Sequence, residues 1–288
     1  LNIMQQLSLV QFVLSRAFYS ILTLVAALGV LFNFSLFFVT LRTKSLRSTC
    51  HILIGICALL DGIHQIGPMF LSPMLFADQP IDNMKCSLLM AVIEVGLLGG
   101  TTCTMCIGLE RLTAILFVTF YQKISRTRHI IFHMLLIICF TGYASYLMIE
   151  HFESGEQMCS IIAPFHGRAA DIFVGNLLLV NAATILIYTI VAIAIARKTD
   201  VSPYLRRAFN CLFIVMLVDV GGWAMSIGFL TLSLSLDVSE ETGAILSFAS
   251  GIFVHIGIAS KAFIYYSISD EYRHAFRSVF GKMLHNVR

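Results

Sequence analysis

Long apolar stretches alternate with short charged segments along the chain. Three of them, within 17–41, 130–149 and 172–196, contain no charged side chain, and four others are each interrupted by a single one. A helix needs about 20 apolar residues to cross the hydrocarbon core of a bilayer, and the period-two alternation of transmembrane barrel strands is missing. The pattern predicts an all-α membrane protein, a seven-transmembrane helix bundle with spans over about 17–41, 49–76, 86–118, 129–150, 169–197, 205–235 and 241–268.

Basic residues gather in four segments, which follow the first, third, fifth and seventh predicted spans. Acidic residues predominate in the segments between the other spans. Lys and Arg are enriched in cytoplasmic loops, so we expect an extracellular N-terminus and a cytoplasmic C-terminus. The basic segments contain Arg42, Lys44 and Arg47; Lys123, Arg126 and Arg128; Arg197, Lys198, Arg206 and Arg207; and Arg273, Arg277, Lys282 and Arg288.

The segment 270–284, after the last span, has an amphipathic helical pattern. We expect a short cytoplasmic eighth helix that lies along the inner leaflet. The loops between the spans are too short for a soluble domain, so residues 1–288 are expected to form a single membrane domain. The predicted apolar face of the eighth helix consists of Tyr272, Ala275, Phe276, Val279, Phe280 and Met283.

Composition agrees with a membrane protein, because 58% of the residues are hydrophobic and 12% are charged. The net charge of +3 is small and lies in short clusters, so nucleic acid is not an expected partner. The sequence contains neither a Gly-rich phosphate loop nor a Gly-x-Ser-x-Gly elbow. We therefore expect no enzymatic activity, no cofactor and no metal.

The eight cysteines divide according to their position relative to the spans. Cys86 opens the third span and Cys159 lies in the second outer loop, so only this pair faces the oxidising side of the membrane. We expect a Cys86–Cys159 disulfide, with two free thiols as the alternative. The six others are small buried hydrophobic residues in the simplest interpretation.

Four ionisable residues interrupt the predicted spans: Asp61, Glu94, Asp219 and Lys261. Each costs roughly 2.5 to 3.5 kcal/mol in hydrocarbon, so each is expected to face the bundle interior and find a partner. They are therefore the best candidates for functional residues.

Glu94 lies near the outer end of the third span, where a ligand between the helices would meet its carboxylate. A buried structural hydrogen bond is an equally good interpretation. His64, Trp223 and His255 are candidates to line the same ligand cavity, with ordinary packing as the alternative for each.

Glu110 and Arg111 form an acid–base pair at the cytoplasmic end of the third span. One interpretation is that Glu110 holds Arg111 until a conformational change releases it. A simple interfacial ion pair explains the same two residues equally well.

Several of these residues carry a resemblance to rhodopsin-like G-protein-coupled receptors. Cys86 and Arg111 stand twenty-five residues apart in one span, as in the third helix of that family. Asn33 in the first span and Ala58–Asp61 in the second are similar to its Asn and Leu-x-x-x-Asp motifs. Phe-Ile-Tyr-Tyr at 263–266 and Glu-Tyr-Arg at 271–273 most resemble the nematode serpentine chemoreceptors of the Srsx class.

This resemblance implies a plasma-membrane receptor for an extracellular small molecule or peptide. Ligand binding would shift the equilibrium of the helices and open a cytoplasmic cavity for a heterotrimeric G protein. By the same resemblance, Arg111 would swing into that cavity with Tyr188 and Tyr265 in support.

The sequence departs from the family pattern where Lys261 replaces the Asn of the Asn-Pro-x-x-Tyr motif. The family geometry would place its ammonium near Asp61, where many relatives hold a sodium ion. We therefore predict a polar core of Asn33, Asp61 and Lys261, with an Asp61–Lys261 ion pair in place of sodium. The prolines that the family has in its fifth and sixth helices are also missing.

Two other functions compete with signalling. The first is a binding protein that has the receptor fold but does not activate a G protein, and the departures at Lys261 and at the missing prolines are compatible with it. A small transporter is the other alternative, but the related halves and broken helices of transporters are not seen.

Overall fold

The computed structural model describes residues 3–77, 79–198, 202–235 and 240–286. Within these residues, seven helices are long and apolar enough to cross a membrane. The helices are α1 (Ile3–Arg42), α2 (Thr49–Ala77), α3 (Asn83–Leu116), α4 (Val118–Lys123), α5 (Arg126–Glu150), α6 (Arg168–Arg197), α7 (Pro203–Ser235), α8 (Glu240–Ile268) and α9 (Asp270–Asn286), with strands β1 (Ile81–Asp82) and β2 (Glu156–Gln157).

Each predicted span lies on one of these helices, and the differences are at the ends. The helix α1 begins at Ile3, well before the expected start near residue 17. The helix α3 ends at Leu116, and a non-helical Phe117 separates it from the short α4. The apolar pattern runs through this break, which is why the predicted third span continued to residue 118.

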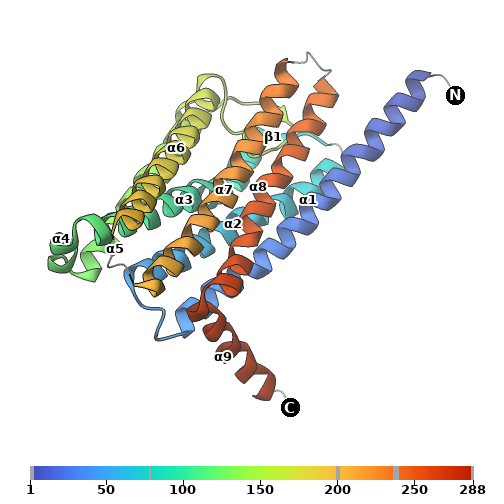
Figure 1. The fold of residues 1–288 in the computed structure, drawn as a ribbon. Helices are drawn as coiled ribbons and strands as arrows, with labels where there is room; N and C mark the ends of the chain where they lie inside the picture. Colours follow the sequence, from blue (N-terminus) through green and yellow to red (C-terminus); the bar gives the residue numbers. More distant parts are fainter. Residues whose placement is uncertain (1–2, 78, 199–201, 236–239, 287–288) are drawn as a thin grey trace.

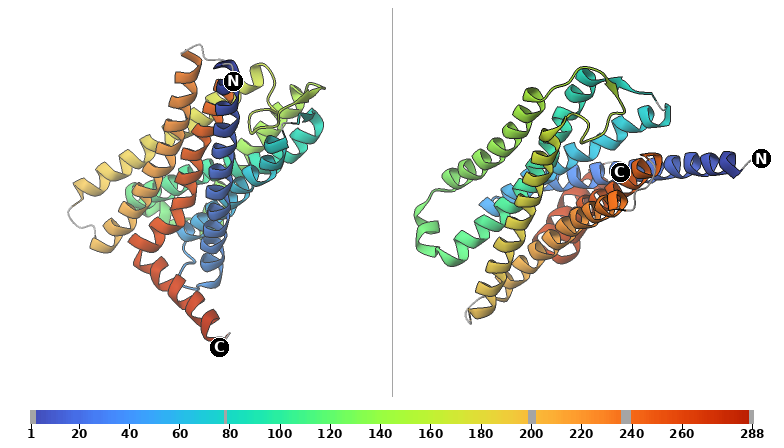
Figure 2. Two further views of the ribbon diagram at one scale, coloured as in Figure 1. Left: turned by 90° about the vertical axis from the view of Figure 1, so that its right-hand side faces the viewer. Right: turned by 90° about the horizontal axis from the view of Figure 1, so that it is seen from above.

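The helix α3 passes through the middle of the bundle and packs against α2, α5 and α6 (Figure 1). On the other side, α1, α7 and α8 pack together, with α8 between its two neighbours. The N-terminus and α9 lie at opposite ends of the bundle (Figure 2). Residues from several helices therefore converge on α3 and α8 in the interior.

Large apolar side chains cover the outward faces of the bundle. Leu24 and Leu31 of α1 are about 60% exposed, as is Leu186 of α6. Water would disfavour such a surface, whereas lipid tails solvate it well. The chain is therefore a multi-pass membrane protein.

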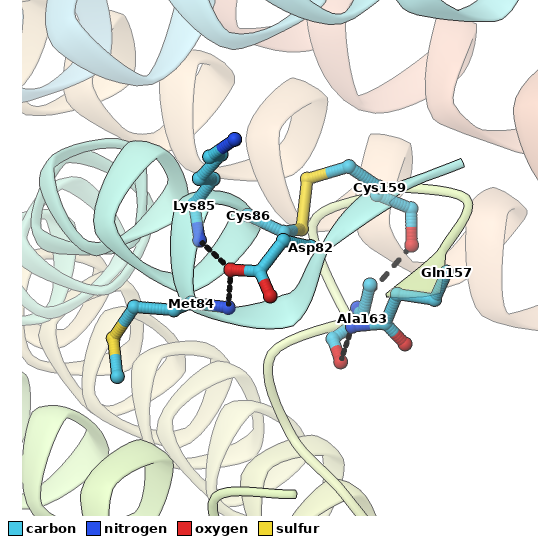
Figure 3. Close-up of a disulfide and its surroundings, with 8 residues drawn as sticks. Asp82, Met84, Lys85, Cys86, Gln157, Cys159 and Ala163 are labelled. Atoms are coloured by element: carbon cyan, nitrogen blue, oxygen red, sulfur yellow. Dashed lines mark hydrogen bonds between the residues drawn. A yellow bond between two sulfur atoms is a disulfide. The ribbon is translucent and has the colours of Figure 1, made fainter. Parts of the chain in front are cut away.

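One end of the bundle is closed by a disulfide between Cys86 at the start of α3 and Cys159 in the loop after α5, with an S–S distance of 1.99 Å. Figure 3 shows that Asp82 lies beside this bond and accepts from the backbone N–H groups of Met84 and Lys85, which caps α3. The strands β1 and β2 pair antiparallel next to it. The predicted Cys86–Cys159 pair is confirmed, and we call this the disulfide end.

The opposite end carries α9, and we call it the α9 end. Tyr272 and Ala275 of α9 are buried in the core, and Phe276 packs against it, while Arg277 is exposed. Arg273 donates to the backbone carbonyls of Tyr266 and Ser267, which satisfies the last turn of α8. This is the amphipathic helix that was expected over 270–284; the side chain of Met283 lies outside the described part.

Candidate functional site

Three charged side chains from three helices meet in the middle of the bundle. The Nζ atom of Lys261 on α8 lies 2.9 Å from Oδ2 of Asp61 on α2 and 3.0 Å from Oδ2 of Asp219 on α7. All three residues are at most 4% exposed. We call this group the charge triad; removing one member of a buried pair typically costs about 3 to 5 kcal/mol.

Hydrogen bonds connect the charge triad to two more helices, α3 and α6. Thr104 of α3 donates to Oδ2 of Asp219 at 3.1 Å, and the hydroxyl of Tyr188 on α6 donates to the backbone carbonyl of Thr104 at 3.4 Å. The thiol of Cys57 donates to Asp61 at 3.5 Å. A side chain at position 100 would overlap the Asp61 carboxylate, so Gly100 leaves the room that this carboxylate occupies.

A cavity of about 10 Å³ adjoins the charge triad and is lined by Asn33, Asp61, Thr104 and Lys261 among others. This is about the volume that one water molecule needs. The side-chain amide of Asn33 donates to the backbone carbonyl of Gly29 at 3.0 Å, while its Oδ1 atom has no donor among the described residues. The predicted polar core is therefore assembled around one small polar space.

The predicted ion pair between Asp61 and Lys261 is present, but the sequence analysis did not give Asp219 a partner. Counting how far each charged residue lies from the end of its helix would have suggested Lys261 as the partner of Asp219. Asp61 lies 12 residues after Thr49 at the start of α2, and Asp219 lies 14 residues after Leu205 in α7, both counted from the α9 end. The two carboxylates therefore lie at similar depths in the bundle, within reach of one long lysine side chain.

Glu110 and Arg111 form a second buried ionic group, near the α9 end of α3. Arg111 donates through Nε at 2.5 Å and through Nη2 at 2.8 Å to the two carboxylate oxygens of Glu110. The hydroxyl of Tyr121 on α4 donates to the same carboxylate at 2.6 Å. Burial and this hydrogen bond raise the pKa of Tyr121 to about 12. The sequence pattern predicted the acid–base pair, but it could not show that α4 folds back to satisfy it.

A cavity of about 300 Å³ opens beside Arg111 between α2, α3, α7, α8 and α9. We call it the α9-end cavity. Tyr265 and Tyr272 line it, and His51 and Glu271 contact each other at one side with an Nε2–Oε2 distance of 2.8 Å. Of the two tyrosines expected to support Arg111, Tyr265 therefore lines the same cavity as Arg111, whereas Tyr188 lines the small cavity beside the charge triad.

The four residues proposed to bind ligand fall into three places. The rings of His64 and His255 are stacked, with centroids 5.0 Å apart. Gln65, which the sequence analysis did not single out, links α2 to α8 through Nδ1 of His255 at 2.7 Å. Trp223 packs instead against the cluster that contains Leu97, Leu98 and Phe173.

Glu94 is only 3% exposed, and neither of its carboxylate oxygens has a hydrogen-bond partner among the described residues. The alternative interpretation of Glu94, a structural hydrogen bond, therefore has no donor in this part of the chain. Within the same residues, no group of three His, Cys, Asp or Glu side chains is placed to hold a metal ion.

The chain was compared with known protein families and with curated proteins. No curated protein matches the chain. The family described as serpentine type 7TM GPCR chemoreceptor Srsx matches residues 26–280, which include α2 to α8, the disulfide, the charge triad and Arg111. The chain belongs to the Srsx family of serpentine seven-transmembrane chemoreceptors.

Proposed function

We propose that this chemoreceptor detects an extracellular ligand at the disulfide end of the bundle and activates a heterotrimeric G protein at the α9 end. The observation that carries the proposal is the α9-end cavity, whose lining includes Arg111 of α3 and residues of α7. A cavity of about 300 Å³ with a guanidinium group in its lining suits the end of a partner helix. The basic segments lie on the same side, which agrees with a cytoplasmic position in the plasma membrane.

The proposed ligand carries a positive charge, as in a protonated amine. A carboxylate in a water-excluded position needs a cation or donors, and the described part of the chain provides neither for Glu94. Glu94 stands eight residues after Cys86, about 12 Å along the helix from the disulfide end. His64, His255 and Trp223 would complete the ligand site after the helices rearrange around it.

Activation in this proposal widens the α9-end cavity by displacing α7. Leu205, Ala208, Cys211 and Leu212 of α7 form one wall of the cavity, so an outward movement of this helix enlarges it. Arg111 then exchanges Glu110 for groups of the G protein, with Tyr265 beside it in the same cavity. The ligand stabilises the open state only to the extent that its affinity for the open state exceeds its affinity for the resting state.

Basal nucleotide exchange tests the coupling without a known ligand. The purified receptor is placed in vesicles with a purified heterotrimer, and guanine nucleotide exchange is compared with that of Arg111→Ala. We expect the substitution to abolish receptor-dependent exchange, because it removes the guanidinium group from the lining of the cavity. Arg128→Ala is the matched control, since Arg128 is exposed at the same end and does not line the cavity.

The outcomes also separate the competing functions. Equal exchange in all three proteins, at the level of vesicles without receptor, would contradict coupling and favour a receptor-fold binding protein. Accumulation of labelled amines inside receptor vesicles would instead favour the small transporter.

A further inference from the structure

Lys261 joins two helices whose separation is the central event in the proposed function. Its ammonium binds Asp61 of α2 and Asp219 of α7 at nearly equal distances, 2.9 and 3.0 Å. The helix α2 belongs to the part of the bundle around α3, whereas α7 forms the wall of the α9-end cavity that has to move.

We propose that the Lys261–Asp219 ion pair is a latch that holds α7 in its closed position, while Asp61 retains the Lys261 ammonium when the latch opens. This inference rests on the proposed function, because it assigns the residue that restrains the movement of α7.

The other described polar contacts of α7 are weaker restraints. Ser226 donates to Ser250 of α8 at 3.1 Å, a bond between neutral groups. Arg207 pairs with Asp270 at 2.6 Å, but both side chains are more than half exposed, and an exposed ion pair typically contributes about 0 to 1 kcal/mol because water and salt screen it. The bonds of Asp219 to Lys261 and Thr104 are both buried, so they are the strongest of the described polar contacts between α7 and its neighbours α3 and α8.

The second carboxylate explains how such a latch opens without leaving the Lys261 ammonium unpaired. When α7 moves away, Lys261 keeps its bond to Asp61, so the ammonium is never left unpaired in the interior. If Asp219 were the only carboxylate partner of Lys261, the same movement would leave the ammonium without a counter-charge.

The test compares two substitutions that remove the same charge from the same ammonium. Asp219→Asn cuts the ionic link to α7, and Asp61→Asn leaves that link intact. Nitroxide labels on cysteines introduced at Arg206 of α7 and Arg128 of α5, both exposed, report the position of α7 by electron-spin distance measurement. The background carries Cys139→Ala, because Cys139 is an exposed thiol.

We expect Asp219→Asn to shift the label-to-label distance distribution to longer values, while Asp61→Asn keeps the wild-type distribution. Basal nucleotide exchange should rise about tenfold in Asp219→Asn, the size of an ordinary population shift. It should not rise in Asp61→Asn and should fall if the wild type has measurable basal exchange, because Lys261 would then lose its only counter-charge when α7 moves. Asp219→Glu keeps the carboxylate and should restore the short distance.

The distance measurement needs neither a ligand nor a G protein, so it separates the two proposals. A longer distance in Asp219→Asn without a rise in exchange supports the latch and contradicts coupling. Equal changes in Asp219→Asn and Asp61→Asn overturn the latch, since simple loss of charge compensation would then explain both, and an unchanged distance in Asp219→Asn overturns it too.

A milder variant decides the matter if Asp219→Asn does not fold. Thr104→Ala removes the hydrogen bond from α3 to Asp219 and keeps every charge of the triad. We expect a smaller lengthening in the same direction; a distribution equal to that of the wild type would then overturn the proposal.

Discussion

At the scale of single residues, the charges inside the membrane separate into satisfied and unsatisfied ones. Asp61, Asp219 and Lys261 compensate each other, and Glu110 has Arg111 and Tyr121. Glu94 alone among the described buried carboxylates has no partner for either oxygen. A group left in this condition is a candidate for a partner that arrives from outside the chain.

Replacing Glu94 with Gln should abolish the response to cationic ligands while the protein stays folded. The amide keeps the shape of the side chain and removes the charge that attracts an amine. The measurement is nucleotide exchange in response to a panel of alkyl and aryl amines together with their neutral alcohol analogues. An amine response that survives Glu94→Gln, or that is lost equally with the alcohol response, would show that Glu94 is not the counter-charge.

The sequence predicted which residues are chemically unusual better than it predicted their contacts. An ionisable residue in an apolar stretch is visible in the sequence, and so the four buried charges were all identified. Their pairing depends on helix rotation and depth, which the pattern leaves open. The Asp61–Lys261 pair was expected only through a family resemblance, and Asp219 joined it because α7 and α8 pack closely.

At the scale of elements, glycines set the close approach of α7 and α8. A Cβ atom at Gly222 would lie 2.8 Å from the backbone carbonyl oxygen of Phe253 on α8. A Cβ atom at Gly257 of α8 would likewise lie 3.0 Å from the backbone carbonyl oxygen of Val218 on α7. Small residues let membrane helices approach closely and gain packing energy. These two contacts lie on either side of Asp219 in the sequence of α7, so they help to bring it to Lys261.

Gly222→Ala should destabilise the bundle, because a backbone carbonyl cannot rotate away from the added methyl group as a side chain would. Overpacking of this kind typically costs about 1 to 3 kcal/mol. Gly221→Ala is the matched control, since a Cβ there meets nothing within 4 Å and alanine favours the helix. Thermal unfolding in detergent should show a lower midpoint for Gly222→Ala only; equal midpoints for the two variants would contradict the close approach.

At the scale of the whole molecule, the positions of the charged segments and of the disulfide agree on one orientation. The Cys86–Cys159 bond lies at one end and the basic segments at the other. Disulfides persist in oxidising compartments, and basic loops remain in the cytoplasm. Both tendencies support the proposed orientation, in which the disulfide end faces the outside of the cell.

Labelling of intact cells with a membrane-impermeant thiol reagent checks this orientation. A cysteine in place of Glu150, exposed at the disulfide end, should react in intact cells. A cysteine in place of Arg277, exposed on α9, should react only after the membrane is permeabilised. The reverse pattern would show that the α9 end faces the outside, and it would remove the basis for a G protein in the α9-end cavity.

The number and order of the spans followed from the apolar pattern, because hydrocarbon imposes the length of each helix. The pattern could not show that α1 continues to Ile3 beyond the length a bilayer needs, or that α4 and the short β1–β2 pair form between spans. The α9-end cavity could not be predicted from the sequence either, since it depends on how five helices leave space between them.

The covalent attachment of Lys261 has a consequence for the conditions under which the receptor works. A dissolved cation leaves its site when the surrounding medium is dilute and returns when the medium is salty, so a receptor that depends on one changes its threshold with salinity. The ammonium of Lys261 is part of the chain, and its concentration beside Asp61 and Asp219 is the same in fresh water and in brine. Asp61 and Asp219 therefore keep their counter-charge whatever salt the medium contains.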